Sequence, residues 1–205
     1  MKGLVPRFLA PRSAARPRGA RLVEGFSPKL GRRVTLFDHT AFGAWIDLEA
    51  DPDVLTFCER PAVTVAEAAG ASIDFWVRRG DGEHFVSIVG SEASGGWPQP
   101  LVDGIAVHRF TGADLAARRM WVTNWQRMLP VVNATRGLLS AVLLKSVQAC
   151  VCEPLPLARI EREVSRGDVV LARGAIFELL RTGRLAAPAL RTQPLSLHSV
   201  MEPVR

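Results

Sequence analysis

The feature that most restricts the fold of this chain is a pair of alternating segments joined by the turn Gly80-Asp81-Gly82. In the first segment Ile73, Phe75 and Val77 alternate with Asp74, Trp76 and Arg78, and the second segment runs from His84 to Val89. Alternation at every second position is typical of a β-strand, and glycine with aspartate favours a tight turn. We therefore predict a β-hairpin over residues 73–89.

An amphipathic helix and short strands are predicted before this hairpin. The helix is indicated by apolar residues at helical spacing, and Asp51-Pro52 ends it. These apolar residues are Phe37, Ala41, Trp45 and Leu48. Residues 54–58 are β-branched and aromatic, and residues 63–65 offer a second short extended piece. After the hairpin, residues 90–100 are rich in glycine, serine and proline, which predicts a loop or linker at a domain boundary.

The C-terminal half is expected to be mainly helical. Thr111 can cap a helix that ends at Pro130, and a further helix is expected at about 131–144. Two more helices, around 156–165 and 169–181, are separated by a Gly-Asp turn and followed by an extended tail. This order predicts a winged helix-turn-helix. Trp121, Trp125 and Met128 are expected to pack in a helix core rather than to stack on bases.

Positive charge is concentrated at the N-terminus. Residues 1–33 hold nine basic side chains and one acid, a charge of +8 against +6 for the whole chain. Four prolines prevent a continuous helix here, so we expect a disordered arm that either contacts phosphates or is an inert tail, with a transit peptide as a third interpretation. The expected regions are a basic arm at 1–33, an α/β core at 34–100, a helical connecting region at 101–150 and a winged-helix-like domain at 151–205.

The remaining composition argues against several classes of protein. The three cysteines, Cys58, Cys150 and Cys152, lack the spacing of a zinc site and are expected to be reduced packing residues. No apolar run reaches the roughly 18 residues of a membrane span, and no signal-peptide block begins the chain. We therefore expect a cytoplasmic protein with no membrane partner. Arginine used in preference to lysine, without tyrosine, indicates a GC-rich bacterial genome.

The segment LEADPDVLTFCERPAVT, with Asp-Phe opening a strand about ten residues later, resembles the N-terminal nuclease domain of TnsA. TnsA is the endonuclease subunit of heteromeric cut-and-paste transposases and belongs to the PD-(D/E)xK nucleases. The resemblance covers about residues 36–90; beyond them the similarity is one of layout only. It implies an α/β (α+β) restriction-endonuclease-like core with a mixed sheet and flanking helices. It also implies double-stranded DNA, transposase and ATPase subunits as partners, and Mg²⁺ as the cofactor of any remaining activity.

The family's chemistry needs a helix acid, an aspartate on the first hairpin strand and an acid-x-lysine pair on the second. The metal and the lysine activate water and stabilise charge on the phosphorane. In this sequence Asp74 stands at the metal-binding aspartate, whereas Ser87 and Val89 occupy the positions of the acid and the lysine. Ala41 occupies the helix position, although Asp38 lies three residues earlier on nearly the same face. None of the chain's three lysines falls in the hairpin.

The resemblance therefore implies a nuclease fold whose cleavage is lost or impaired, with Asp74 as a weak metal ligand and Asp38 as a substitute acid. Each residue also has a purely structural interpretation. Asp74 can cap a turn or pair with Arg78 or Arg79. Asp38 can be a first-turn acid that favours the positive end of the helix.

DNA contact is expected from arginines, because guanidinium groups bind phosphates in a bidentate manner. The candidates are Arg32, Arg33, Arg159, Arg162, Arg166, Arg173, Arg181 and Arg184. Acidic neighbours nearly cancel the C-terminal set, so a solvated mixed-charge face or a protein-binding face explains that set as well. The sequence favours a DNA-binding transposition protein with an inactive or impaired endonuclease fold. The alternatives are an accessory transcriptional regulator that uses the old core as a scaffold, and an active metal-dependent endonuclease with a rearranged site.

Overall fold

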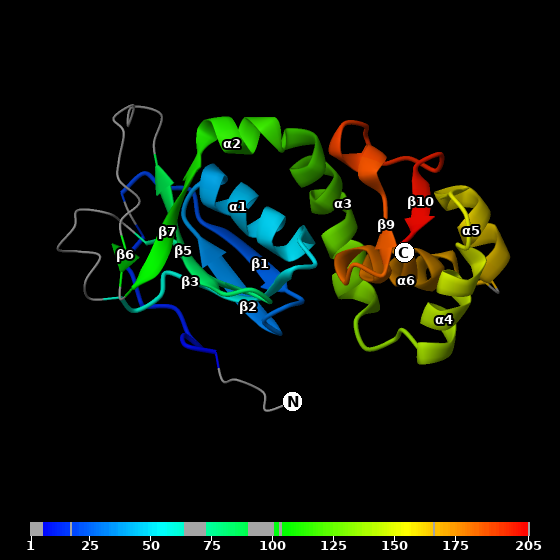
Figure 1. The fold of residues 1–205 in the computed structure, drawn as a ribbon, viewed down its shortest axis with the longest axis horizontal. Coiled ribbons are helices and arrows are strands. Elements are labelled where there is room, and N and C mark those ends of the chain that lie inside the picture. The colour runs from blue at the N-terminus through cyan, green and yellow to red at the C-terminus, as the bar shows by residue number, and fades with distance from the viewer. Residues whose placement is uncertain are drawn as a thin grey trace. The chain divides into compact units, whose positions relative to one another are not determined.

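The structure is a computed structural model that describes residues 6–16, 18–63, 73–89, 101–102, 104–165 and 167–204. The chain is mixed α/β and divides into two compact units (Figure 1). The first comprises Met1–Leu48 and Asp53–Ala117, and the second comprises Glu49–Pro52 and Arg118–Arg205. In the described part of the chain, no helix has both the length and the apolar character needed to cross a membrane.

A five-stranded mixed sheet with the order β3-β4-β5-β7-β6 forms the centre of the first unit. Its strands are β3 (Val54–Glu59), β4 (Phe75–Arg79), β5 (Glu83–Val89), β6 (Leu101–Val102) and β7 (Ile105–Thr111). The first three strands pair antiparallel, and β7 then pairs parallel to β5. The predicted hairpin is confirmed, because β4 and β5 pair with Trp76 opposite Phe85. The predicted class, an α/β fold with a mixed sheet and flanking helices, is also confirmed at this level.

The first helix, α1 (His39–Ala50), packs within this unit against the hairpin of β1 (Val23–Ser27) and β2 (Arg32–Leu36) (Figure 1). Gly25 of β1 touches the Trp45 ring of α1 so closely that a Cβ at this position would overlap the ring. On another side of α1, Gly43 meets Leu115 of the short helix α2 (Gly112–Ala117) in the same way. Small residues thus let α1 approach both neighbours.

The expected disordered arm at 1–33 is corrected by this hairpin, which occupies residues 23–36. Val34 and Leu36 of β2 are buried, and the turn closes at Gly31, whose φ of 64° suits glycine. Two basic residues of this segment, Lys29 and Arg32, are bound inside the fold. Lys29 Nζ donates to the carbonyl oxygens of Leu48 (2.8 Å) and Val54 (2.7 Å). The prediction of a disordered arm, which relied on charge and prolines, is therefore wrong for residues 23–33.

The preceding N-terminal residues also lie on the sheet. The Phe8 ring packs edge-on against Trp76, with centroids 5.7 Å apart, and lies 6.1 Å from Phe85. These rings belong to a core cluster with buried Cys58, so the prediction that this cysteine packs inside is confirmed. Cys152, in contrast, is exposed.

The first unit extends beyond the expected boundary at residue 100. The parallel pairing of β7 with β5 places residues 105–111 in the central sheet, and α2 follows at once. Residues 101–117 therefore belong to the α/β unit rather than to a helical connecting region. The predicted loop at 90–100, like part of the extended piece at 63–65, lies outside the described residues.

The second unit contains four helices and a small sheet with the order β8-β10-β9 among its described residues. The helices are α3 (Arg119–Thr135), α4 (Ala141–Cys150), α5 (Leu157–Val164) and α6 (Val169–Arg181). The strands are β8 (Leu155–Pro156), β9 (Leu185–Ala186) and β10 (Val200–Pro203), and a 3-10 turn, η1, spans Pro188–Arg191. The expected helices at 156–165 and 169–181 match α5 and α6 closely.

The predicted helix end at Pro130 is wrong. Helix α3 continues through this proline to Thr135, and Met128, Leu129 and Val132 on both sides of it are buried. Burial of this face outweighs the one backbone hydrogen bond that proline removes. The next helix consequently begins later than expected, at Ala141, where the Ser140 hydroxyl caps it by accepting a hydrogen bond from Leu143 N (3.1 Å).

The aromatic residues of α3 pack much as predicted, since Trp125 and Met128 are fully buried. The sequence did not indicate the neighbouring Asn124, which is only 1% exposed. Its amide nitrogen donates to the carbonyl oxygens of Leu190 (2.7 Å) and Gln193 (2.8 Å), and its oxygen accepts from Leu195 N (2.7 Å). One buried amide therefore holds the segment that follows η1.

Candidate functional site

Asp74 lies just before β4, at a point where three segments of the first unit meet. Its backbone N–H donates to Val86 O (2.9 Å), and its carbonyl accepts from Arg60 N (2.7 Å). Its carboxylate accepts a hydrogen bond from Ile88 N at 2.7 Å. In the described part of the chain this carboxylate forms no ion pair with Arg78 or Arg79, so the backbone of β5 is what holds it.

The two positions that the resemblance assigns to the missing acid and lysine lie directly beside this contact. Ser87 and Val89 are the residues before and after Ile88, whose N–H binds Asp74. Ser87 is 6% exposed and lies opposite Arg109 of β7 in the sheet. The structure thus brings the predicted positions together with Asp74, and neither of them carries a charge.

Asp38 lies at the N-terminus of α1, as a helix-capping residue does. Its carboxylate accepts from Ala41 N (2.7 Å), and its carbonyl accepts from Phe42 N (3.1 Å). Ala41, the position expected for the family's helix acid, is buried. The carboxylate of Asp38 is close enough to Asp74 to raise the pKa of that group. Asp38 therefore both caps the helix and contributes negative charge near Asp74.

A cavity of about 270 Å³ joins these two aspartates. Its charged lining residues are Arg12, Asp38, Glu59, Arg60 and Asp74, and apolar walls come from Leu36, Phe37, Ile73 and Phe75. The pKa of Asp74 is raised to about 6, chiefly by burial and also by the nearby Asp38 carboxylate, whereas the Ile88 N–H and Arg60 act in the opposite direction. The cavity therefore holds a carboxylate that titrates close to neutral pH.

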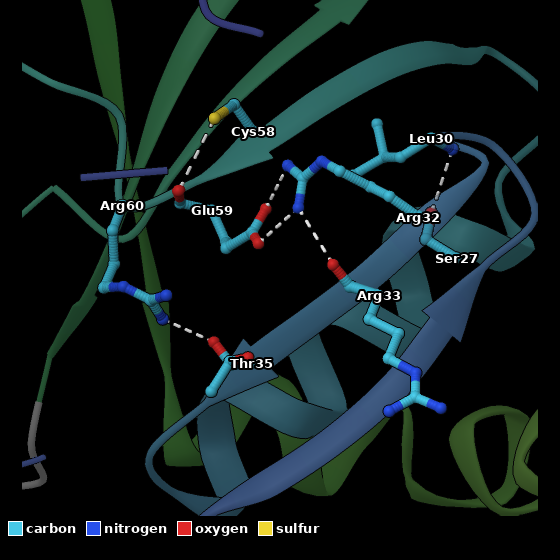
Figure 2. Close-up of polar contacts among 8 residues, drawn as sticks. All are labelled: Ser27, Leu30, Arg32, Arg33, Thr35, Cys58, Glu59 and Arg60. Atoms are coloured by element: carbon cyan, nitrogen blue, oxygen red, sulfur yellow. Dashed lines mark hydrogen bonds and ion pairs between the residues drawn. The ribbon is translucent and has the colours of Figure 1, made fainter. Parts of the chain in front are cut away.

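Glu59, the third acid of the cavity, is neutralised by Arg32 (Figure 2). Two guanidinium nitrogens of Arg32 donate to the two Glu59 carboxylate oxygens, each at 2.6 Å. Glu59 is only 1% exposed, and its charge raises the pKa of Arg32, chiefly through the hydrogen bonds. Arg32, expected to contact DNA, is therefore committed to an ion pair within the fold.

Arg60, like Glu59 and Arg12, is a residue of the cavity that the sequence did not indicate, since Glu59-Arg60-Pro61 suggested only the end of a strand. Figure 2 shows its side chain directed toward β2, where it donates to Thr35 O. The guanidinium carbon lies 4.9 Å from the centroid of the Phe37 ring. Its φ of 45° is the one left-handed value among the described non-glycine residues. A proline after a charged residue was the only available signal.

The chain matches no family model and shows no match among curated proteins.

The acids around Asp74 form a poor ligand set for Mg²⁺. The described residues contain no group of three or more His, Cys, Asp or Glu side chains placed to hold a metal ion. The Asp74 and Asp38 carboxylates each accept a backbone N–H, and Glu59 is bound by Arg32. A hard cation takes several oxygen ligands, and with Glu59 bound by Arg32 only the second oxygens of Asp38 and Asp74 remain for one here.

Most of the C-terminal arginines expected to contact DNA have partners in their own unit. Arg173 binds Glu161 through two hydrogen bonds (2.5 and 2.9 Å), and Arg181 binds Glu178 through two (2.8 and 2.6 Å). Arg159 pairs with Glu163 at 3.0 Å, and Arg184 donates to Gln148. Arg162 and Arg33 are exposed and form no ion pair with any described carboxylate, and Arg166 lies outside the described residues.

We predict that Asp74→Asn stabilises the protein above pH 6 and has little effect near pH 4. Between pH 4 and 6 the native chain keeps a proton on Asp74 that the unfolded chain has released, so wild-type stability falls as the pH rises through this range. A pKa raised from 3.8 to about 6 corresponds to roughly 2–3 kcal/mol at neutral pH. Asparagine avoids this cost and can still accept the Ile88 N–H.

Chemical denaturation at several pH values between 4 and 8 measures this difference. Asp81→Asn, in the exposed turn of the same hairpin, is the matched control. A stability difference between Asp74→Asn and wild type that stays constant over the whole range would show that the Asp74 carboxylate is not shifted in the native state.

Proposed function

We propose that this chain is a DNA-binding, TnsA-like protein in which a restriction-endonuclease-like unit retains its fold and has lost cleavage. One observation carries the proposal: Ile88, whose N–H binds the Asp74 carboxylate, is flanked by Ser87 and Val89. These are the positions where the resemblance expects the catalytic acid and lysine. We infer that Asp74 is the remaining charged residue of a cleavage site in which the acid and the lysine have been replaced by Ser87 and Val89.

The arrangement of the first unit supports the fold part of this proposal. A helix followed by a three-stranded antiparallel meander, with a further strand parallel to its last member, gives the mixed sheet that the resemblance implies. The helix begins directly after its capping residue Asp38, which lines the same cavity as Asp74. Helix acid and strand aspartate are thus brought to one place, although the helix position itself is Ala41.

The loss of cleavage follows from the charges that remain. Cleavage of this type needs free carboxylate oxygens for the metal and a cation beside the scissile phosphate. One oxygen of Asp38 and one of Asp74 accept backbone hydrogen bonds, Glu59 is bound by Arg32, and the side chain at position 89 is apolar. We therefore expect DNA to be bound and left intact.

The second unit supports DNA binding by its order of elements. A helix, a strand, two helices and two strands follow one another as α4, β8, α5, α6, β9 and β10, which is the order of a winged helix-turn-helix. Because Arg159, Arg173 and Arg181 are paired with glutamates, phosphate contact falls to Arg162 and, in the first unit, to Arg33, which pair with no carboxylate in the described part of the chain. Transposase and ATPase subunits are the protein partners that the same resemblance suggests.

Fluorescence anisotropy with a labelled duplex, combined with a cleavage assay in Mg²⁺ or Mn²⁺, tests the proposal. We expect binding that weakens steadily with salt, and no strand breakage above background. Arg33→Ala and Arg162→Ala should each weaken binding and lower the salt slope by about one. Arg159→Ala, an exposed arginine already paired with Glu163, should change the salt slope less.

Two results would overturn the proposal. Absence of duplex binding at low salt would remove DNA as the ligand. Cleavage by the wild-type protein that Asp74→Ala abolishes would identify an active endonuclease with a rearranged site.

A further inference from the structure

Arg60 brings a positive charge to the Asp74 cavity without an ion-pair partner of its own. Among the described residues, its guanidinium donates to the carbonyl of Thr35, packs over Phe37 and forms no ion pair with a carboxylate. Its Nε atom is buried away from solvent and has no hydrogen-bond partner among the described residues, so a ligand would contact the terminal guanidinium nitrogens. Because Arg60 lines the cavity and no described carboxylate pairs with it, an anionic ligand there would be favoured.

The backbone of Arg60 is held in an unfavourable conformation. A left-handed φ of 45° is unfavourable for a residue with a side chain, by about 1–3 kcal/mol at such positions. Two hydrogen bonds maintain it: Arg60 N donates to Asp74 O (2.7 Å), and Arg60 O accepts from Arg12 N (2.8 Å). The end of β3, the start of β4 and the N-terminal segment thus fix one cation beside the cavity.

Of the three carboxylates that line the cavity, Asp74 is the one that would repel a bound anion most strongly. Glu59 is neutralised by Arg32, and Asp38 is stabilised by the positive N-terminal end of α1. Arg12 adds a second cation to the lining. Asp74 remains, held between Arg60 and the backbone of β5.

We propose that this cavity binds a phosphate group, with Arg60 as its main ligand and Asp74 as the carboxylate that limits its affinity. The inference rests on the proposed function, because it assigns the phosphate to bound DNA. Arg60 then supplies, from the end of β3, the positive charge that position 89 of β5 lacks.

The test compares inorganic phosphate with two duplexes that differ only in a 5′-phosphate, using calorimetry on the full chain. Arg60→Asn removes the charge while asparagine tolerates the left-handed backbone, so this variant is expected to fold. It should weaken phosphate binding about tenfold or more, as loss of a charge-assisted hydrogen bond does. Asp74→Asn should strengthen it about fivefold or more through loss of the opposing charge. Arg119→Asn, an exposed arginine of the second unit, is the matched control and should bind phosphate as wild type does.

The duplexes distinguish the source of the phosphate. If both duplexes bind alike and both weaken with Arg60→Asn, the ligand is a backbone phosphodiester; if only the phosphorylated duplex responds, it is a strand end. Phosphate binding that depends on Arg60, with no response from either duplex, would support the site and contradict DNA as its source. If phosphate binding is absent, or unchanged in Arg60→Asn, the site is refuted even where duplex binding persists.

Discussion

Replacing Arg32 with methionine is expected to lower the free energy of unfolding of the first unit by about 3–5 kcal/mol, the usual cost of leaving a buried charge without its partner. Glu59 is 1% exposed and receives both of its 2.6 Å hydrogen bonds from Arg32. Methionine covers a similar area and cannot donate, so the carboxylate must either remain unpaired or take up a proton. Chemical denaturation followed by tryptophan fluorescence measures the loss.

Arg33→Met is the matched control for this prediction. Arg33 is the next residue of the same strand, but it is exposed and pairs with no described carboxylate. We expect it to change stability by less than about 0.5 kcal/mol. The double variant Arg32→Met/Glu59→Gln should regain much of the stability lost by Arg32→Met, because it removes the negative charge of the buried, unpaired Glu59 carboxylate. Equal stability of Arg32→Met and Arg33→Met would show that the ion pair does not hold the β1–β2 hairpin to β3.

Asn124→Ala is expected to destabilise the second unit by about 3–5 kcal/mol, since each buried group left unsatisfied costs about 1–3 kcal/mol. The substitution removes the partners of two carbonyl groups and one N–H, those of Leu190, Gln193 and Leu195. Denaturation gives the magnitude of the loss. Amide hydrogen exchange locates it, because the Leu195 N–H should lose its protection.

Thr123→Ala provides the comparison for this second variant. Thr123 precedes Asn124 on α3 and is exposed, so its replacement should leave both stability and Leu195 exchange nearly unchanged. If Leu195 remained protected in Asn124→Ala, the segment after η1 would be held by other contacts.

Local patterns predicted the parts of the fold that depend on neighbours in sequence. The hairpin of β4 and β5 followed from alternation and a glycine turn, and α6 followed from the Gly167-Asp168 turn before it. The structure adds that Asp168 caps this helix, because its carboxylate accepts from Leu171 N at 2.9 Å. The pairing of β5 with β7 had no such signal. Parallel neighbours join through a distant connection, and no short motif marks which strand will pair.

The charged residues show most clearly where sequence reasoning fell short. Lys29 and Arg32 increase the positive charge of the N-terminal segment in the same way as Arg33, yet the first two are bound within the fold and the third is exposed. A count of charges carries no information on partners that lie far along the chain. Similarly, Asp74 was identified from the resemblance, whereas Arg60 required the meeting of three segments that only the folded chain reveals.

The packing of Phe8 on Trp76 and Phe85 determines how this protein must be handled. Among the described residues, the ring of Phe8 near the start of the chain packs over Trp76 and Phe85 on one face of the sheet. Truncation or proteolytic trimming past residue 8 would expose the rings of Trp76 and Phe85 and create an apolar surface patch that favours aggregation. Preparations that lose these few residues are therefore expected to aggregate, and purification tags belong at the C-terminal end.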